Sequence, residues 1–363
     1  MQYRTMRSTG DDLSVLGAGA MRLPGKRGGI DEQRARTQLY RLIDAGVNYI
    51  DTAWAYHAGA SEPFLGRILT GTYRDRVHIA TKLPYWMVDT RADMDRLLDI
   101  QLDRLKTDCI DYYLIHNIGG ASWEKMLTLG LVDFMEKAKQ SARVRHLGFS
   151  SHVGTEDFKA VVDGYDWQFC QLQYNYLDEF AQAGTEGLEY AASKGLGIII
   201  MEPLRGGMLT GLPEHIAEPF DKLGGSYASY GFRWLAEKPG IMTVLSGMNE
   251  LSQVEENIEI FTDPQPLTDA EHAAVKEVER NILAANKVPC TRCAYCQPCP
   301  KEIDIPRIFR VWNERALERN PEPISPELIN QAKACIKCRK CERVCPQSII
   351  ITDELQRFVK ENT

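Results

Sequence analysis

Eight of the ten cysteines in this 363-residue chain lie in two short runs near its C-terminal end. The first run, CTRCAYCQPCP, spans residues 290–300, and the second, CIKCRKCERVCP, spans residues 335–346. The second run has the spacing C-x2-C-x2-C-x3-C-P, which is that of a bacterial ferredoxin, and the first run is one residue shorter before its last cysteine. The spacing therefore predicts two 4Fe-4S clusters.

Each cluster is expected to take its fourth ligand from the other run, because the last cysteine of each run does so in two-cluster ferredoxins. Zinc is the alternative, but structural zinc sites typically use two well-separated C-x2-C pairs. The amino terminus lacks the apolar stretch of a signal peptide, which predicts a cytoplasmic protein, and clustered cysteines in such a reducing compartment are expected to be metal ligands rather than disulfides. The expected ligand sets are Cys290, Cys293, Cys296 and Cys345 for one cluster, and Cys335, Cys338, Cys341 and Cys299 for the other.

Four further side chains are of types used in proton transfer: Asp51 and Tyr56 in DTAWAY, Lys82 in ATKLP and His116 in YYLIHN. An ammonium beside a phenol stabilises the phenolate, so Lys82 is expected to lower the pKa of Tyr56, with Asp51 holding the lysine as a buried ion pair. His116 would then orient a carbonyl group while Tyr56 donates a proton, which suits reduction of a carbonyl to an alcohol. Each residue has an ordinary structural interpretation when it is taken singly.

These side chains need a scaffold that brings strand ends together. Eight short β-rich runs alternate with helical stretches: LSVLGAGA, VNYIDTA, VHIATKL, IDYYLIH, VRHLGFSS, WQFCQLQ, LGIIIME and IMTVLSG. One helical stretch, residues 91–108, has Met94, Leu97, Leu98, Leu102 and Leu105 at helical spacing. The alternation predicts an α/β protein with a parallel sheet, and eight units favour a closed (β/α)8 TIM barrel with its chemistry at the C-terminal strand ends.

The segments DTAWAY, ATKLP, YYLIHN, GFSSH, QLQYN and EENI occur in the order and approximate spacing of the aldo-keto reductases, which the chain resembles over residues 3–260. The resemblance implies that Asp51, Tyr56, Lys82 and His116 are the catalytic set. Aromatic side chains near this set would wall a substrate pocket, with core filling as the alternative; they are Trp54, His57, Tyr85 and Trp86.

The same resemblance implies residues for a nicotinamide cofactor, NAD(H) or NADP(H). Gly206 and Gly207 suit close backbone approach to a pyrophosphate, with a plain turn as the alternative. Met201 stands where many members stack an aromatic ring on the nicotinamide. The remaining implied contacts are Ser150, Ser151 and Gln171 for the carboxamide, and Glu256 and Asn257 for the adenine.

Two departures from the family pattern bear on the cofactor. NADPH-using members commonly carry basic residues where this chain has Gly247 and Gln253. Charge-assisted bonds to phosphate contribute roughly 1.5 to 3 kcal/mol each, so their loss favours NADH. Because Met201 also softens the stacking platform, three alternatives stay open for the barrel: a nicotinamide, a flavin such as FMN, or no permanent organic cofactor.

The chain is expected to contain a barrel domain over residues 1–262, a helical linker over 263–287 and a small, mainly helical ferredoxin-like domain over 288–363. The net charge of −7 argues against nucleic-acid binding, and the longest apolar run, LGIIIM, is too short to span a membrane. A helix within 304–320 would bury one apolar side formed by Ile305, Ile308, Phe309, Trp312 and Ala316.

Together these features predict an oxidoreductase that acts on a small-molecule carbonyl or alcohol and whose clusters pass electrons to or from an external carrier. A ferredoxin- or flavodoxin-type carrier would suit the basic residues beside the second cysteine run, with a solvated face as the alternative; they are Lys333, Lys337, Arg339, Lys340 and Arg343. Two other functions stay open: a plain NAD(H)-dependent reductase with structural or redox-sensing clusters, and an electron-transfer module with a non-catalytic barrel.

Overall fold

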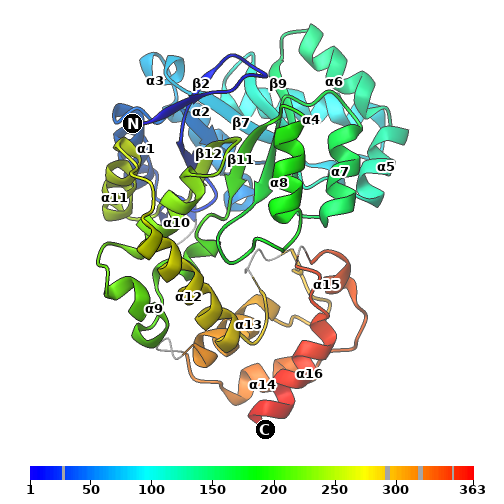
Figure 1. Ribbon diagram of the computed structural model, residues 1–363. Coiled ribbons are helices and arrows are strands. Elements are labelled where there is room, and N and C mark those ends of the chain that lie inside the picture. The colour runs from blue at the N-terminus through cyan, green and yellow to red at the C-terminus, as the bar shows by residue number, and fades with distance from the viewer. Residues whose placement is uncertain (27–28, 291–294, 318–321, 346) are drawn as a thin grey trace. The chain divides into compact units, whose positions relative to one another are not determined.

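The computed structural model of the protein describes residues 1–26, 29–290, 295–317, 322–345 and 347–363. Eight parallel strands close into a barrel in the order β10, β11, β12, β3, β6, β7, β8, β9 (Figure 1). Each strand lies within one of the eight apolar runs, so the predicted TIM barrel is confirmed. The strands are Leu16–Gly19 (β3), Tyr49–Asp51 (β6), His78–Leu83 (β7), Ile110–Ile115 (β8), Val144–Ser151 (β9), Phe169–Gln173 (β10), Gly197–Met201 (β11) and Ile241–Ser246 (β12).

Helices follow the strands and cover the barrel. They include α1 (Glu32–Asp44), α2 (Ser61–Ile68), α3 (Thr72–Asp75), α4 (Arg91–Leu105), α5 (Ala121–Thr128), α6 (Leu131–Gln140), α7 (Thr155–Asp163), α8 (Gly184–Ser193) and α11 (Leu251–Thr262). Helix α4 is the one predicted from its apolar spacing, with one correction: Gln101 is fully buried, whereas Leu102 is only half-buried. A polar side chain takes this core position because hydrogen bonds satisfy it there.

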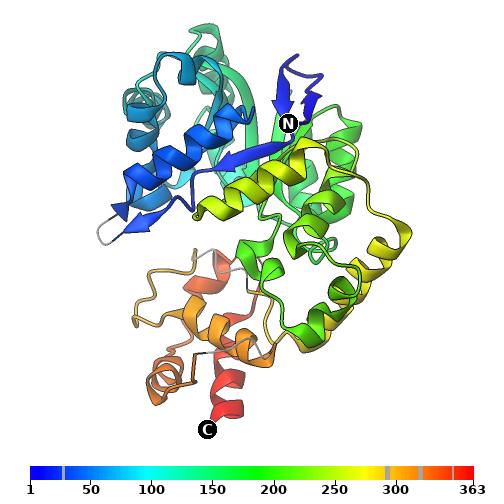
Figure 2. The ribbon, with the colours of Figure 1, turned by 90° about the vertical axis from the view of Figure 1, so that its left-hand side faces the viewer.

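Helices α1 and α11 are far apart in the sequence but lie side by side (Figures 1 and 2). Closure of the barrel brings them together, since β12 pairs with β3 in parallel. Two ion pairs join the helices, Arg34 with Glu250 at 2.7 Å and Arg41 with Glu255 at 2.7 Å. Both pairs are exposed, so each stabilises the contact by no more than about 1 kcal/mol.

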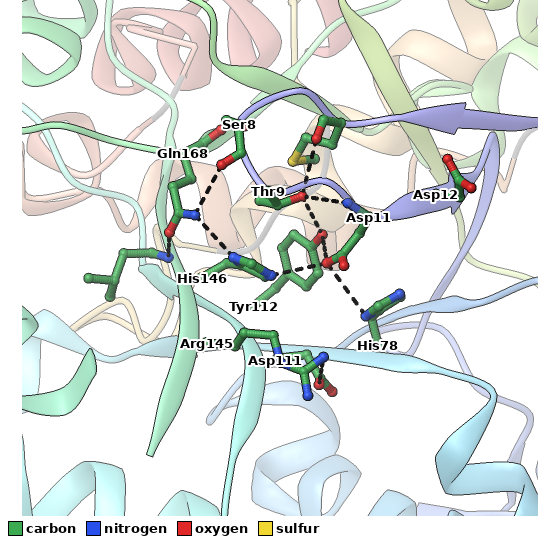
Figure 3. Close-up of polar contacts among 12 residues, drawn as sticks. Ser8, Thr9, Asp11, Asp12, His78, Asp111, Tyr112, Arg145, His146 and Gln168 are labelled. Carbon is green, nitrogen blue, oxygen red and sulfur yellow. Dashed lines mark hydrogen bonds and ion pairs between the residues drawn. The ribbon is translucent and has the colours of Figure 1, made fainter. Parts of the chain in front are cut away.

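The N-terminal end of the barrel is closed by the segment between β1 (Tyr3–Thr5) and β2 (Asp12–Ser14). Met6 is fully buried in the barrel core, and Asp11 accepts a hydrogen bond from Tyr112 Oη at 2.7 Å (Figure 3). The same carboxylate lies 3.0 Å from His146 Nε2, and Gln168 contacts the other ring nitrogen of that histidine at 3.1 Å. This polar cluster lies at the strand starts, opposite the strand ends that carry the predicted chemistry.

The chain forms two compact units that differ from the expected domain boundaries. The first comprises residues 1–174, 178–203 and 232–266, and the second comprises residues 175–177, 204–231 and 267–363. Segment 204–231 was expected within the barrel domain. Its helix α9 (Glu214–Asp221) packs instead on α12 (Asp269–Ala285), where Asn281 Nδ2 donates to the carbonyl of Ile216 at 3.3 Å.

The second unit is mainly helical in its C-terminal part, and Thr268 caps the N-terminus of α12, where its hydroxyl accepts from the amide of Glu271. The predicted apolar helix is α13 (Ile305–Ala316), and it buries Val311 rather than Ala316. Its face packs within the second unit on α14 (Pro326–Lys333) and α16 (Ile351–Asn362), with a short α15 (Lys340–Arg343) beside them. Among the helices that the structure describes, none combines the length and apolarity needed to cross a membrane.

Candidate active site

Lys82 and Asp51 form a buried ion pair at the C-terminal ends of β7 and β6. Lys82 Nζ donates to Asp51 Oδ2 at 2.7 Å, to Asp51 Oδ1 at 2.8 Å and to the carbonyl of Thr52 at 2.7 Å. The two side chains are only 1% and 3% exposed. Burial lowers the pKa of Lys82 and raises the pKa of Asp51, while the attraction between them opposes both shifts. These bonds hold the ammonium in one position.

Tyr56 begins the short helix η1 (Tyr56–Gly59), and its hydroxyl lies 3.4 Å from Lys82 Nζ. Burial raises the pKa of Tyr56 well above 10, and the charges of Asp51 and Glu202 act in the same direction. The expected lowering of this pKa is therefore wrong for the chain alone, because burial and the charges of these two carboxylates disfavour the phenolate. The phenol stays protonated at neutral pH, which is the state that a proton donor needs.

His116 follows β8 directly, and its ring centroid lies 6.4 Å from that of Tyr56 with the ring planes nearly perpendicular. Burial and the charge of Lys82 hold the pKa of His116 well below its usual 6.5, so the imidazole is neutral. Its Nδ1 atom is buried and finds no hydrogen-bond partner among the described residues. A neutral imidazole without such a partner is suited to bind a substrate oxygen.

Two of the four aromatic side chains expected around a pocket lie beside His116. Trp86, in the short helix η2 (Tyr85–Met87), has its ring 5.1 Å from that of His116 and is 44% exposed, and Tyr85 packs edge-on against it. The other two are engaged elsewhere. The guanidinium of Arg104 lies over the ring of Trp54 at 3.8 Å. Nε2 of His57 accepts a hydrogen bond from the backbone amide of Leu23 at 3.2 Å.

A buried polar network supports Lys82 from behind, and sequence patterns gave no signal for it. The Glu62 carboxylate is fully buried and accepts from Thr81 Oγ1 at 2.7 Å, Gln101 Nε2 at 2.6 Å and Arg104 Nη1 at 3.0 Å. Gln101 Nε2 also donates to the carbonyl of Lys82 at 3.0 Å. The network therefore fixes the backbone from which the lysine projects.

The residues expected to hold a carboxamide lie together on neighbouring strands, because β10 pairs with β9 and sets Gln171 opposite Ser150. Ser150 Oγ accepts from the amide of Asn117 at 2.8 Å, and Ser151 is buried beside it. Gln171 Nε2 contacts Met201 Sδ at 3.7 Å, whereas its Oε1 is buried and has no partner among the described residues. A buried acceptor is costly when it is unpaired, so this atom fits the NH2 of a nicotinamide carboxamide.

Gly206 and Gly207 belong to the second unit, whereas the expected catalytic set belongs to the first. Their φ angles are +67° and +87°, a left-handed backbone that glycine adopts without the penalty of a Cβ. A Cβ at Gly207 would meet nothing within 4 Å. The glycines thus satisfy a turn, and their approach to a pyrophosphate stays a prediction.

Helix α11 carries the two residues expected to face an adenine. Asn257 is buried and donates to Ser246 Oγ at 2.9 Å, and Glu256 is half-buried. Gln253 caps the same helix: its Oε1 accepts from the amides of Asn249 at 2.9 Å and Glu250 at 3.3 Å. The side chain at position 253 is therefore committed to the helix terminus.

Arg22 is a residue that sequence reasoning missed. A Cβ built on Gly247 would lie 3.1 to 3.3 Å from the Cβ, Cγ and Cδ atoms of Arg22, so the arginine stem lies across this glycine. Arg22 follows β3 and Gly247 follows β12, and only the closure of the barrel makes these segments neighbours. Spacing in the sequence gave no sign of this contact.

Four of the predicted cluster ligands line one cavity of about 90 Å³ in the second unit: Cys296, Cys299, Cys338 and Cys341. This cavity includes Cys299 with two members of its expected set, and it also includes Cys296, which was expected in the other set. Among the described residues, no three His, Cys, Asp or Glu side chains are placed to hold a single metal ion. In a 4Fe-4S cluster the cysteine thiolates surround a cage of iron and sulfide instead of meeting at one metal ion. A cavity lined by four thiols fits that arrangement.

Three further predicted cluster ligands that the structure describes do not line this cavity. Cys290 lines a second, small cavity of about 30 Å³ with Arg205, Met208 and Arg310. Cys335 and Cys345 are half-buried against the apolar core of the C-terminal helices. Cys293 lies outside the described residues.

The model of the Aldo/keto reductase family matches residues 15–280, which is most of the chain. The chain belongs to the aldo/keto reductase family. A second family model, the 4Fe-4S dicluster domain, matches residues 289–350. The protein is therefore an oxidoreductase of this family with a C-terminal 4Fe-4S dicluster domain.

Several named members of the family are similar to the chain over most of its length. L-galactose dehydrogenase of Arabidopsis thaliana is 27% identical over 78% of this chain and 96% of its own. L-glyceraldehyde 3-phosphate reductase of Escherichia coli K12 is 25% identical over 72% of this chain and 88% of its own. Among solved structures, an aldo-keto reductase from Klebsiella pneumoniae in complex with NADPH has a TM-score of 0.64 at 24% identity, covering 77% of this chain and 96% of that one.

Proposed function

We propose that this aldo/keto reductase interconverts a carbonyl and an alcohol group on a small molecule, and that two 4Fe-4S clusters exchange electrons with an external carrier. The observation that carries the proposal is the convergence of the phenol of Tyr56, the ammonium of Lys82 at 3.4 Å and the neutral imidazole of His116. In reduction, the carbonyl carbon takes a hydride and the oxygen takes a proton. A bound nicotinamide supplies the hydride. Tyr56 supplies the proton while His116 holds the oxygen.

The nicotinamide is held by Gln171, Ser150 and Ser151 in this proposal, with Met201 against its ring. The unpaired buried Oε1 of Gln171 supports that assignment. Gly247 and Gln253 lack the charge that would hold a second phosphate, which favours NADH, whereas the charge of Arg22 acts in the opposite direction. A yellow supernatant after acid precipitation of the protein would show FMN instead.

The substrate is a small carbonyl or alcohol compound with an apolar part that rests on Trp86, the partly exposed ring beside His116. The names of the two relatives make L-galactose and L-glyceraldehyde 3-phosphate the first compounds to assay. Aromatic aldehydes and ketones complete the panel, since a large exposed ring stacks well on an indole.

The eight cysteines of the two runs hold the clusters, each run receiving its fourth ligand from the other. The cavity shared by Cys299, Cys338 and Cys341 supports the exchange for the second cluster. Two runs of clustered cysteines suit a reducing, cytoplasmic setting. Anaerobic protein should contain about eight iron and eight sulfide per chain.

The external carrier is an acidic one-electron carrier of the ferredoxin or flavodoxin type, which docks beside the second cluster. Cys338 is exposed, and so are the five basic side chains around it. Exposed apolar side chains, Ile336 at 56% and Val344 at 50%, lie in the same stretch. Lys340 and Val344 both line the cavity of the four cysteines. An apolar centre with a basic rim complements an acidic partner and predicts electron transfer that slows as salt is added.

Replacement of Tyr56 by phenylalanine tests the chemistry directly. The variant keeps the ring and loses the proton, so kcat for every reduced substrate should fall by about 100-fold or more. Tyr190→Phe is the matched control, because its hydroxyl donates to the exposed Asp163 and belongs to none of the site's hydrogen bonds. Unchanged turnover in Tyr56→Phe would refute the reductase site. Reduction of the clusters by NADH alone, seen as bleaching of the brown protein, tests their link to the barrel.

A further inference from the structure

The cation expected after the eighth barrel strand is present in this chain, but it comes from a different strand. Gly247 has no side chain, and the stem of Arg22 lies over it at contact distance. Any larger residue at position 247 would meet Arg22 Cβ, Cγ and Cδ at 3.1 to 3.3 Å. The absence of a side chain at Gly247 therefore leaves the space that the stem of Arg22 occupies.

The guanidinium of Arg22 forms no ion pair with the described residues. Its side chain is exposed, and no carboxylate or carbonyl among the described residues accepts a hydrogen bond from it. Two neighbouring arginines differ in this respect, since Arg34 and Arg41 are already paired with Glu250 and Glu255. The guanidinium of Arg22 is therefore available to bind an anionic ligand beside the loop that follows β12.

The position of that loop indicates what the guanidinium binds. In TIM barrels a phosphate group is frequently held by the loops after the seventh and eighth strands, here β11 and β12. A guanidinium presents a planar fork that matches the oxygens of a phosphate monoester. The diphosphate is common to NADH and NADPH, whereas the additional monoester occurs only in NADPH.

We propose that Arg22 binds the 2′-phosphate of NADPH and is the residue that sets the nucleotide preference of this enzyme. The inference rests on the proposed function, because it requires a nicotinamide nucleotide in the barrel. Arg22 replaces the basic side chain that position 247 lacks, and the protein accepts NADPH at least as well as NADH. Gln253 plays no part in this discrimination, because its amide caps α11.

The test uses two fragments that differ only in the phosphate of interest, 2′,5′-ADP and 5′-AMP. Their binding to the full anaerobic protein is measured by calorimetry at low salt. We expect 2′,5′-ADP to bind about tenfold more tightly than 5′-AMP, the lower end of what a charge-assisted bond gives, because Arg22 is exposed. In Arg22→Met, which keeps the stem over Gly247, the two fragments should bind equally, with the affinity for 5′-AMP unchanged.

Two further variants separate charge from packing. Arg22→Lys retains a positive charge and should keep part of the preference. Arg36→Met removes an exposed arginine of α1 and should leave both affinities unchanged. In turnover, Arg22→Met should raise the KM for NADPH by about tenfold and leave the KM for NADH unaltered.

Equal affinity of the wild-type protein for the two fragments would overturn the inference and leave the proposed reductase intact. So would a preference for 2′,5′-ADP that survives Arg22→Met. Failure of the protein to bind either fragment, together with no turnover of NADH or NADPH, would remove the proposed function itself.

Discussion

Replacing Lys82 by methionine tests whether the buried ion pair is both a structural and a chemical element. The substitution leaves the Asp51 carboxylate buried without the ammonium that donates to both of its oxygens. Loss of one partner of a buried pair costs about 3 to 5 kcal/mol, because the remaining charge is neither hydrated nor compensated. In a barrel of this size, that cost lowers Tm by about 6 to 20 °C.

The double variant Lys82→Met, Asp51→Asn removes both charges and should recover most of the lost stability, yet it should show no turnover. Unfolding in urea is followed by tryptophan fluorescence, and reduction of the best carbonyl substrate is followed in parallel. Arg41→Met is the control, since it breaks an exposed pair and should change the unfolding free energy by less than about 1 kcal/mol. A Lys82→Met protein as stable as the wild type, or a double variant that turns over normally, would refute the reasoning.

Three other results are expected. Burial lowers the pKa of His152 to about 4 and that of His116 well below 6.5. Both are neutral in the native state, so their contribution to stability is constant above about pH 6.5 and falls between pH 6.5 and 4 as they take up protons in the unfolded chain, by about 3 kcal/mol for His152 alone; an unchanged urea midpoint at pH 5 would contradict this. Glu62→Gln should lower kcat more than it raises KM, because it loosens the network behind Lys82 without touching the substrate pocket; a change in KM alone would show that the network has no positioning role. Cys338→Ser should reduce the iron content from about eight to about four atoms per chain, as measured on oxygen-free preparations, and an unaltered iron content would exclude Cys338 as a ligand.

The barrel could be predicted from the sequence because its signals are local. Each strand is a short apolar run, and α4 shows its apolar face at helical spacing. The exception on α4 has a physical cause. Gln101 reads as polar in the sequence, but Glu62 and Tyr113 satisfy its amide, so it can be buried in the protein core.

The features that the sequence did not reveal depend on contacts between distant segments. Arg22 meets Gly247 only because the first and last barrel strands pair. The raised pKa of Tyr56 depends on burial and on Glu202, which lies at the end of another strand. Types and spacing identified the groups that do the chemistry, whereas their protonation states and partners required the folded arrangement.

Met6 and the polar cluster around Asp11 close the barrel at its strand starts, and this closure has a consequence for product release. Because the strand starts are filled, substrate enters and product leaves at the C-terminal strand ends, where His116 lies. Product and substrate therefore use the same opening, so an alcohol product that dissociates slowly should act as a competitive inhibitor of its own formation.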